Sequence, residues 1–399
     1  MKVVQINCTY EYGSTGKITK DLHTAVKQCG FESWVLYGRR QDSEQEDVIK
    51  TCSEFEAKCF NVLSRFTGKP YKCSPCATYN LIRSLEKIKP DVVHLQCVNG
   101  FFVDNYRLLS YLKKKKIPTV LTLHAEFMYT GNCSYAFDCE QWKFGCLQCP
   151  DIYKAIRSKC FDTTHVNWES MKNAFDGFEK LKICAVSYWV KMRAEQSPIL
   201  NQYPITTVLN GIDTKIFYYR RKEAEQFRHS INIGVRKIVL HVTADFQNAI
   251  KGGKYITELS NRLDQNKYIV VVVDGNDNQK PEKFRGIYWG RAKSKDELAM
   301  LYSAADMTVL TSERETFSMV CAESLCCGTP VVGFCAGAPE MISLPEYSMF
   351  VQYGNIDELQ EKIESIDDDR HEYVERVAEK KYSKESMVSD YIRIYKSFF

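Results

Sequence analysis

The sequence predicts an α/β protein with two domains, each built around a parallel sheet. Short runs rich in Val, Ile, Leu and Thr, such as those within 3–6, 90–96 and 118–124, are typical of strands that are buried on both faces. Helical patterns separate these runs, and regular alternation of strands and helices favours parallel sheets. The alternation continues to about residue 205 and begins again near residue 237, and a length of 399 residues suits two or three domains.

The composition indicates a globular protein without membrane-spanning segments. A hydrophobic fraction of 44% with 26% charged residues is ordinary for such proteins. A net charge of +4 leaves room for anionic ligands or lipid surfaces and gives no evidence for nucleic-acid binding. No apolar run approaches 18 residues, and residues 1–7 are typical of a first strand rather than of a signal peptide. We therefore expect a cytoplasmic protein, with peripheral contact at the inner face of the membrane as an extension of that expectation.

The first strand, 3–6, is followed by a glycine-bearing loop at 11–18 and a helix expected from about residue 19 to 29. A loop between the first strand and the first helix is where α/β proteins place ligands. Gly16 is therefore a candidate for ligand binding, with a simple tight turn as the alternative. The next strand is expected at 33–37, and residues 41–80 are expected to be irregular.

Further strands at 90–96 and 118–124 enclose a helix at 106–116 that ends in four lysines. These lysines, 113–116, suit either a solvated helix terminus or contact with anionic lipid. His124 stands at the carboxyl end of its strand, which makes it a candidate for the ligand site, although a lone histidine is more often a core or surface residue.

Four of the 17 cysteines, namely Cys133, Cys139, Cys146 and Cys149, lie within 17 residues after the His124 strand. Four thiols that end in a Cys-x2-Cys pair suit one tetrahedral Zn²⁺. Reduced thiols are an equal alternative and a disulfide is a third. Zinc in this loop would brace the fold rather than take part in chemistry.

In the second half, a polar stretch at 218–232 indicates a domain boundary, and strands are expected at 237–242 and 268–274. Lys251 precedes Gly252-Gly253 at the expected start of a helix. A lysine beside the unpaired amides of a helix terminus is suited to bind phosphate, with an ordinary surface lysine as the alternative.

The stretch from Met307 to Glu340 is expected to form a strand, a helix and a second strand, and it carries Glu315 and Glu323. On one helix these acids would stand roughly 12 Å and about 80° apart, too far for an acid/base pair but suited to the two ends of a long ligand. The expected first-turn amides of residues 316–318, which are Thr316, Phe317 and Ser318, are donors for a diphosphate. A nucleotide sugar has this shape, and two solvated glutamates are the alternative.

Four segments carry a resemblance to a known family. Glu315-Thr-Phe-Ser, the run 322–332 and Gly337-Ala338-Pro339-Glu340 together resemble the E-x7-E signature of retaining GT-B glycosyltransferases of family GT4. Thr122-Leu123-His124 resembles the Thr-Leu-His-Asp segment of the GT4 branch that builds bacterial capsule, exopolysaccharide and O-antigen. The resemblance implies a GT-B fold, with two Rossmann-like domains facing across a cleft.

The resemblance also implies roles for single residues. It places Glu315 and His124 at the donor sugar, Glu323 at the donor ribose, and Lys251 on the donor phosphates. The amides near Gly337 and Ala338 are expected to help to hold the diphosphate.

The implied domains are an acceptor domain at 1–205, to which a helix at 380–399 crosses back, and a donor domain at 206–379. The implied partners are a UDP- or GDP-sugar and a saccharide or lipid-linked acceptor. No metal or other cofactor is required for catalysis, and nucleic acid is not expected as a partner.

The chain departs from the family pattern at two points. Ala125 stands where the branch has aspartate, with Glu126 next, and Asp245-Phe246 stand where many members carry an arginine before Lys251. These departures keep a non-catalytic nucleotide-sugar-binding protein as an alternative function. A nucleotide-sugar epimerase of GT-B fold and a zinc-braced nucleic-acid module are the other two alternatives.

Overall fold

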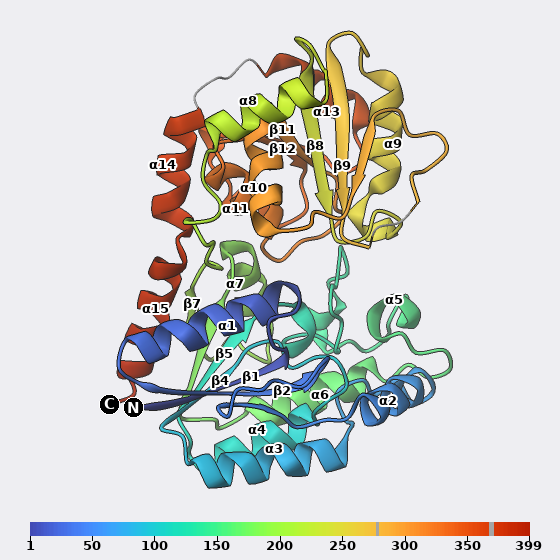
Figure 1. Ribbon diagram of the computed structural model, residues 1–399. Coiled ribbons are helices and arrows are strands. Elements are labelled where there is room, and N and C mark those ends of the chain that lie inside the picture. Colours follow the sequence, from blue (N-terminus) through green and yellow to red (C-terminus); the bar gives the residue numbers. More distant parts are fainter. Residues whose placement is uncertain (277–278, 367–370) are drawn as a thin grey trace. The chain divides into compact units, whose positions relative to one another are not determined.

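The computed structural model describes residues 1–276, 279–366 and 371–399. The chain forms two compact units, one made of 1–209 with 388–399 and the other of 210–387 (Figure 1). Each unit contains a parallel sheet with helices on its faces. The sequence-based boundary lay at 205/206 with a return at 380, whereas the structure divides the chain after Leu209 and after Met387.

The first unit holds a seven-stranded parallel sheet in the order β3-β2-β1-β4-β5-β6-β7. The strands are β1 (Lys2–Thr9), β2 (Glu32–Arg39), β3 (Val48–Lys50), β4 (Val92–Leu95), β5 (Thr119–Leu123), β6 (Leu181–Ala185) and β7 (Ile205–Thr207). From β1 the chain first adds strands on one side and then, from β4, on the other. The carboxyl ends of β1 and β4 therefore flank a topological switch point, where open α/β sheets bind ligands.

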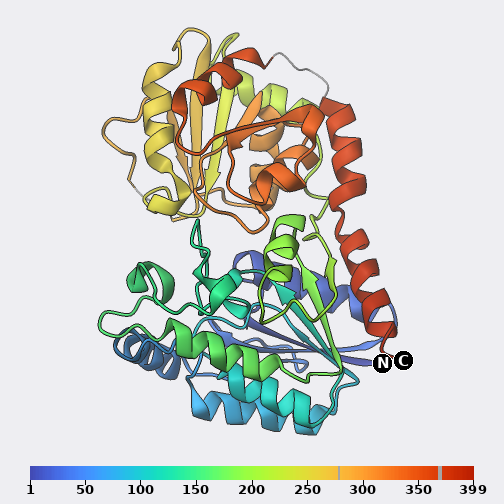
Figure 2. The same cartoon turned by 180° about the vertical axis from the view of Figure 1, so that it is seen from behind.

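Helices cover both faces of this sheet, with α3, α4 and α6 along one face and α1 on the other (Figures 1 and 2). The helices of this unit are α1 (Gly13–Gln28), α2 (Glu54–Thr67), α3 (Pro75–Ile88), α4 (Asn105–Lys114), α5 (Ile152–Ile156), α6 (Thr164–Phe175), α7 (Tyr188–Glu195) and most of α15 (Lys384–Lys396). Short 3₁₀ turns lie at Glu126–Met128 and Gln141–Phe144.

The second unit holds a six-stranded parallel sheet in the order β10-β9-β8-β11-β12-β13. The strands are β8 (Lys237–Thr243), β9 (Tyr268–Asp274), β10 (Ile287–Gly290), β11 (Met307–Leu310), β12 (Val331–Phe334) and β13 (Ser348–Val351). The helices are α8 (Arg221–Ser230), α9 (Gly253–Arg262), α10 (Lys295–Ala304), α11 (Met319–Cys326), α12 (Pro339–Ile342), α13 (Ile356–Ser365) and α14 (His371–Tyr382), with 3₁₀ turns at Ala249–Lys251 and Pro345–Tyr347. Its switch point lies between β8 and β11.

The strands are rich in β-branched residues, and β9 with its sequence Tyr-Ile-Val-Val-Val-Val-Asp shows this most clearly. All seven residues of β9 are buried, and Val270 and Val272 pack in one cluster with Val239 of β8 and Val309 of β11. A strand with helices on both faces has no solvent side, so its apolar residues do not alternate with polar ones. The prediction of parallel sheets from continuous apolar runs is confirmed.

The expectation of irregular structure at 41–80 is wrong. The region contains β3, α2 and the first part of α3. Helix α2 follows Ser53, whose hydroxyl caps it, and ends at Gly68, which has a φ of 68°. Its buried residues are Ala57 and Ser64, so the helix packs through small side chains that an apolar periodicity does not mark.

Two further boundaries differ from the expectation. The polar stretch 218–232 contains helix α8, which buries Ala224 and Phe227. Helix α1 begins at Gly13 rather than near residue 19. Within the described residues, no helix is both long enough and apolar enough to span a bilayer.

Candidate functional site

Lys251 and Glu315 form an ion pair at the switch point of the second unit. Lys251 lies in the turn after β8, and Glu315 follows β11, which is the neighbouring strand. The Lys251 Nζ and Glu315 Oε1 atoms are 2.6 Å apart, with 26% and 18% of the two side chains exposed. The sequence predicted both residues as site residues, and the fold brings them together where a ligand can reach them.

The loops that carry this pair are fixed to one another by main-chain contacts. The Thr311 hydroxyl donates to the Lys251 carbonyl over 3.1 Å, and the Glu313 amide donates to the Ile250 carbonyl over 2.8 Å. Gly252 has a φ of 70°, and a Cβ at this position would lie 2.1 Å from the Thr311 carbonyl oxygen. Only glycine allows this close approach.

Glu315 belongs to an extension of the sheet and not to a helix. Its amide donates to the Ala336 carbonyl over 2.9 Å, its carbonyl accepts from the Ala338 amide over 3.2 Å, and it forms a parallel bridge with Gly337. The expected spacing of two acids on one helix therefore does not apply, because only Glu323 lies on α11. Glu315 stands before the loop that leads into α11, and Glu323 lies in the middle of that helix.

Helix α11 begins three residues later than predicted. Ser318 is its N-cap residue, and the Ser318 hydroxyl accepts from the Cys321 amide over 3.3 Å. The expected donors at 316–318 therefore precede the helix, and the first-turn amides belong to Met319 and Val320. Ser318 adopts a φ of 78°, a strained conformation for a residue with a Cβ, and such strain is concentrated at functional sites.

A buried tyrosine holds the second carboxylate. The Tyr302 hydroxyl, on α10, donates to Glu323 Oε2 over 3.1 Å. Burial and the neighbouring carboxylate raise the pKa of Tyr302 well above its ordinary value, so the hydroxyl keeps its proton. Sequence reasoning missed Tyr302, because an aromatic residue inside an apolar helix gives no signal of this role.

The amides of Gly337 and Ala338 already have acceptors within the chain. Gly337 donates to Glu340 Oε1 over 2.9 Å, and Ala338 donates to the Glu315 carbonyl. Glu340 also accepts from the Ala336 amide over 3.1 Å, so its carboxylate occupies the turn that was expected to hold a diphosphate. A role for these two amides in phosphate binding stays a prediction, and it requires Glu340 to release Gly337.

In the first unit, His124 follows β5 and bonds to a buried glutamine. Its Nε2 lies 2.8 Å from Gln96 Oε1, and because an amide oxygen only accepts, the proton is on Nε2. The Gln96 amide nitrogen donates in turn to Gln5 Oε1 over 3.2 Å. Burial lowers the pKa of His124 to about 4, so the imidazole is neutral near pH 7.

Glu126 is a structural residue. It is completely buried, its Oε1 lies 2.7 Å from Arg193 Nε, and it accepts from the Ala136 amide over 2.7 Å and the Tyr129 hydroxyl over 3.1 Å. These bonds fix the loop after β5. Glu126 therefore does not take the place of the family aspartate that Ala125 lacks.

Gly16 lies within the first turns of α1 and not in an open loop. A Cβ on Gly16 would stand 2.7 Å from Thr9 Oγ1, and its carbonyl accepts from the Glu11 amide over 3.1 Å. Its lack of a side chain lets α1 start close to the end of β1, at the switch point. Contact between Gly16 and a ligand stays a prediction.

The thiols of Cys133, Cys139, Cys146 and Cys149 are free. Burial, with the charges of the other three thiols, raises the pKa of Cys133 well above its ordinary value. In the part of the chain that is described, no three side chains among His, Cys, Asp and Glu are arranged to hold a metal ion. A zinc ion at this cluster stays a prediction that the geometry does not support.

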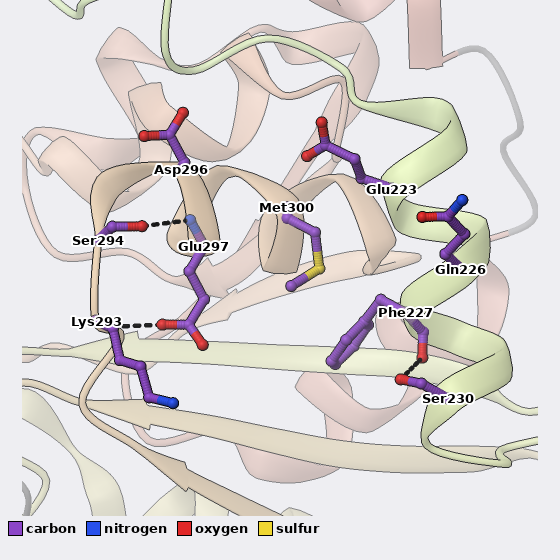
Figure 3. Close-up of a pocket in the computed structure, with 9 residues that line it drawn as sticks. All are labelled: Glu223, Gln226, Phe227, Ser230, Lys293, Ser294, Asp296, Glu297 and Met300. Atoms are coloured by element: carbon purple, nitrogen blue, oxygen red, sulfur yellow. Dashed lines mark hydrogen bonds between the residues drawn. The ribbon is translucent and has the colours of Figure 1, made fainter.

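A surface groove of about 550 Å³ lies elsewhere in the second unit, between α8 and the start of α10 (Figure 3). It is lined by Glu223, Gln226, Phe227, Ser230, Lys293, Ser294, Asp296, Glu297 and Met300. Its three carboxylates disfavour an anionic ligand. None of the predicted site residues lines it.

Two α/β units, each with a parallel sheet and with polar side chains at its switch point, define a protein of the GT-B fold class. Residues 223–384 match the family model described as Glycosyl transferases group 1, and the second unit is therefore a domain of this group.

Solved structures share the whole fold. Sucrose-phosphate synthase from Thermosynechococcus elongatus is similar with a TM-score of 0.70 and 14% identity, and the match covers 100% of this chain and 99% of that one. HepE from Anabaena, solved in complex with UDP-glucose, is similar with a TM-score of 0.67 and 13% identity over 100% of both chains. In sequence, an uncharacterized 41.2 kDa protein in the cps region of Klebsiella pneumoniae is 25% identical, over 94% of this chain and 99% of that protein.

Proposed function

We propose that the protein is a retaining, GT4-like glycosyltransferase that moves a sugar from a nucleotide-sugar donor to a saccharide or lipid-linked saccharide in surface polysaccharide synthesis. The observation that carries the proposal is the Lys251–Glu315 pair at the switch point of a Glycosyl transferases group 1 domain. The relative in a cps region supports the polysaccharide context, and the UDP-glucose complex of HepE supports a UDP-sugar, with a GDP-sugar as the other expected donor.

The donor diphosphate is the group that Lys251 recognises. The departing diphosphate gains negative charge in the transition state, and the Lys251 ammonium together with the leading amides of α11 would stabilise that charge. Glu315 keeps the ammonium in position through the 2.6 Å ion pair. Cationic and amide groups thus do the work that a metal ion does in other transferases, so the reaction needs no metal.

Glu323 binds the donor ribose. A carboxylate accepts hydrogen bonds from two vicinal hydroxyls, and the Tyr302 hydroxyl holds this carboxylate on the first turns of α11. The neutral His124 imidazole is a hydrogen-bond partner for the transferred sugar rather than a general acid, because a pKa of about 4 means that the ring does not carry the second, acidic proton near pH 7. No protein nucleophile is assigned. The acceptor attacks on the face that the diphosphate leaves, and the diphosphate takes the acceptor's proton.

Donor binding is tested first by thermal shift with UDP-, GDP- and ADP-sugars. The wild type and Lys254→Ala are expected to gain melting temperature with one of these donors, whereas Lys251→Ala is expected to gain little. Lys254 is a matched control because it is exposed and lies three residues further along the same segment. The proposal fails if no donor shifts the wild type, or if Lys251→Ala responds like the wild type.

Turnover is tested by release of free nucleoside diphosphate from the donor that binds. A transferase releases it only when an acceptor saccharide is added. Conversion of the donor into a different nucleotide sugar without any acceptor, and without net release of nucleoside diphosphate, would indicate the epimerase instead. Binding without release under any acceptor would indicate a non-catalytic binding protein.

A further inference from the structure

The exposed apolar side chains of the first unit are concentrated on one surface. Helix α2 and residues 144–166 together carry an apolar patch, which consists of Phe55, Val62, Leu63, Phe66, Phe144, Leu147, Tyr153, Phe161 and Val166. Phe55 is 79% exposed and Phe144 is 73% exposed. Single exposed apolar residues are common, but a group of this size marks an interaction surface.

Helix α2 turns its large apolar residues away from the protein. At about 100° per residue, Phe55, Val62, Leu63 and Phe66 fall within an arc of about 100°. The opposite side of the helix holds its two buried residues, an alanine and a serine. A helix of a globular protein usually directs its bulky apolar stripe to the core, so this helix is suited to an apolar surface outside the protein.

Hydrogen bonds join the two parts of the apolar patch. The Lys159 amide donates to the Arg65 carbonyl over 2.8 Å. The Gly68 carbonyl, just after α2, accepts from the Thr163 hydroxyl over 2.5 Å and from the Asn167 amide group over 2.9 Å. The views in Figures 1 and 2 place α2 and α5 on the same side of the unit. The patch is therefore one fixed surface.

The surroundings of the apolar patch are basic. Residues 57–72 and 152–161 contain no acidic residue and seven exposed basic ones, which are Lys58, Arg65, Lys69, Lys72, Lys154, Arg157 and Lys159. Four acids flank these ranges, and each accepts a bond within the protein. Glu54 pairs with Arg39 over 2.9 Å, and Glu56 accepts from the Ala77 amide over 3.1 Å. Asp151 accepts from the Lys154 amide over 2.8 Å, and Asp162 accepts from the Cys149 amide over 2.9 Å. Seven basic residues against these four acids leave three positive charges in excess. The patch thus combines apolar side chains with a surplus of positive charge.

We propose that the apolar patch docks the protein on an anionic phospholipid bilayer. The aromatic and aliphatic side chains enter the interfacial region, while the basic side chains stay at the level of the phosphate headgroups. Charge complementarity favours a lipid surface over a second copy of the chain, because a symmetric dimer through this face would bring two basic rims together. The proposal does not depend on sugar transfer, since docking needs no donor.

This surface differs from the one that the sequence suggested. Among the lysines at 113–116, Lys113 Nζ donates to the Asn173 carbonyl over 3.2 Å and the Asp176 carbonyl over 2.7 Å, and Lys116 pairs with Glu179 at 3.6 Å. Two of these four lysines thus contact the C-terminal end of α6 and the loop that follows it. Helix α4, which carries the first two of these lysines, has no exposed large apolar residue.

The test is co-sedimentation of the full chain with vesicles of phosphatidylglycerol mixed with phosphatidylcholine, and with vesicles of phosphatidylcholine alone. We expect binding to the anionic vesicles that weakens with added salt. Phe55→Ser with Phe66→Ser, and separately Lys58→Glu with Lys69→Glu, are each expected to weaken binding by about tenfold or more. Absence of binding by the wild type, or equal binding to both kinds of vesicle, overturns the proposal.

Two controls make the result specific. Phe399→Ser removes a phenylalanine that is 78% exposed elsewhere, and Lys114→Glu with Lys115→Glu makes the same charge change on α4 and its end. Both are expected to bind like the wild type, and loss of binding in the α4 pair would move the membrane contact there. Light scattering without vesicles measures the molar mass of the protein in solution. If the wild type is a dimer and Phe55→Ser is a monomer, the apolar patch serves self-association instead.

Discussion

Gly252 is the residue at which the two loops of the candidate site come closest. Replacement by alanine places a Cβ 2.1 Å from the Thr311 carbonyl oxygen and strains a backbone whose φ is 70°. We expect Gly252→Ala to lower the free energy of unfolding by about 3 kcal/mol or more. Gly234→Ala is the matched control, because Gly234 has a φ of 62° and a Cβ there would meet no atom within 4 Å, so only the backbone strain remains. That strain costs about 1 kcal/mol.

Chemical denaturation of both variants measures this difference. Equal losses of stability in Gly252→Ala and Gly234→Ala would show that the close approach to Thr311 does not constrain the site.

Glu315 is expected to separate donor binding from transfer. Glu315→Gln removes a negative charge beside the Lys251 ammonium, so an incoming diphosphate meets less repulsion and donor affinity is expected to stay equal or to rise. The rate of transfer is expected to fall by about tenfold or more, since Lys251 loses the carboxylate that positions it. Titration calorimetry and initial rates measure the two effects, with exposed Glu346→Gln as the control. A parallel loss of binding and transfer would contradict this role.

Some residues of the candidate site could be predicted from the sequence and others could not. Lys251, Glu315 and Glu323 stand at predictable places, namely after strands or on a helix in a recognisable run. Tyr302 and Gln96 act through hydrogen bonds to residues 21 and 28 positions away. Such partners are set by packing between elements, and nothing in their local sequence indicates them.

At the scale of elements, strands were easier to predict than helix limits. β8, β9 and β11 are continuous apolar runs, and parallel sheets make these runs unambiguous. The start of α11 was misplaced because Ser318 caps the helix from a positive φ, which no residue pattern signals for serine. Helix α2 was missed because its core-facing residues are small and its large apolar residues point outward.

Ser318 caps α11 from a strained conformation, so its replacement can separate the effect of the cap from that of the strain. Ser318→Ala loses the bond from the Cys321 amide and keeps a Cβ at a φ of 78°, so a loss of about 1 kcal/mol in stability is expected. Ser318→Gly loses the same bond but relieves the strain, and its stability is expected to stay within a few tenths of a kcal/mol of the wild type. Urea denaturation decides, and a glycine variant less stable than the alanine variant would refute the assignment of strain.

For the whole molecule, stability is expected to depend on pH through buried neutral histidines. Burial lowers the pKa of His94 well below its ordinary value, and the pKa values of His124 and His241 fall to about 4. In the unfolded chain each titrates near pH 6.5. Between these limits the unfolded chain binds protons that the folded chain does not, so the stability from each group is complete above pH 6.5 and is lost as the pH falls toward 4.

The expected loss is up to about 3 kcal/mol for each group with a folded pKa of about 4. Urea denaturation at pH 7.5 and at pH 5, monitored by tryptophan fluorescence, measures this loss of stability. His124→Asn lacks one of the titrating groups and is expected to lose less stability across the same interval. A free energy of unfolding that stays flat or rises as the pH falls would show that these histidines are protonated in the folded protein.

The two-unit architecture was predictable because the strand–helix alternation stops and restarts once along the chain. The matches to the GT-B structures and to the Glycosyl transferases group 1 model agree with that prediction. The details of the site depended on contacts among three neighbouring loops of the second unit, which the order of residues alone does not specify.

We propose above all that the switch point between β8 and β11 binds the diphosphate of a nucleotide sugar. The most direct measurement is a crystal structure of the protein with the donor that gives the largest thermal shift. We expect diphosphate oxygens within about 3 Å of Lys251 Nζ and at the amino end of α11, with the ribose hydroxyls on Glu323. A nucleotide bound elsewhere, for example in the groove between α8 and α10, with the Lys251–Glu315 pair intact and no contact to either residue, would contradict this claim.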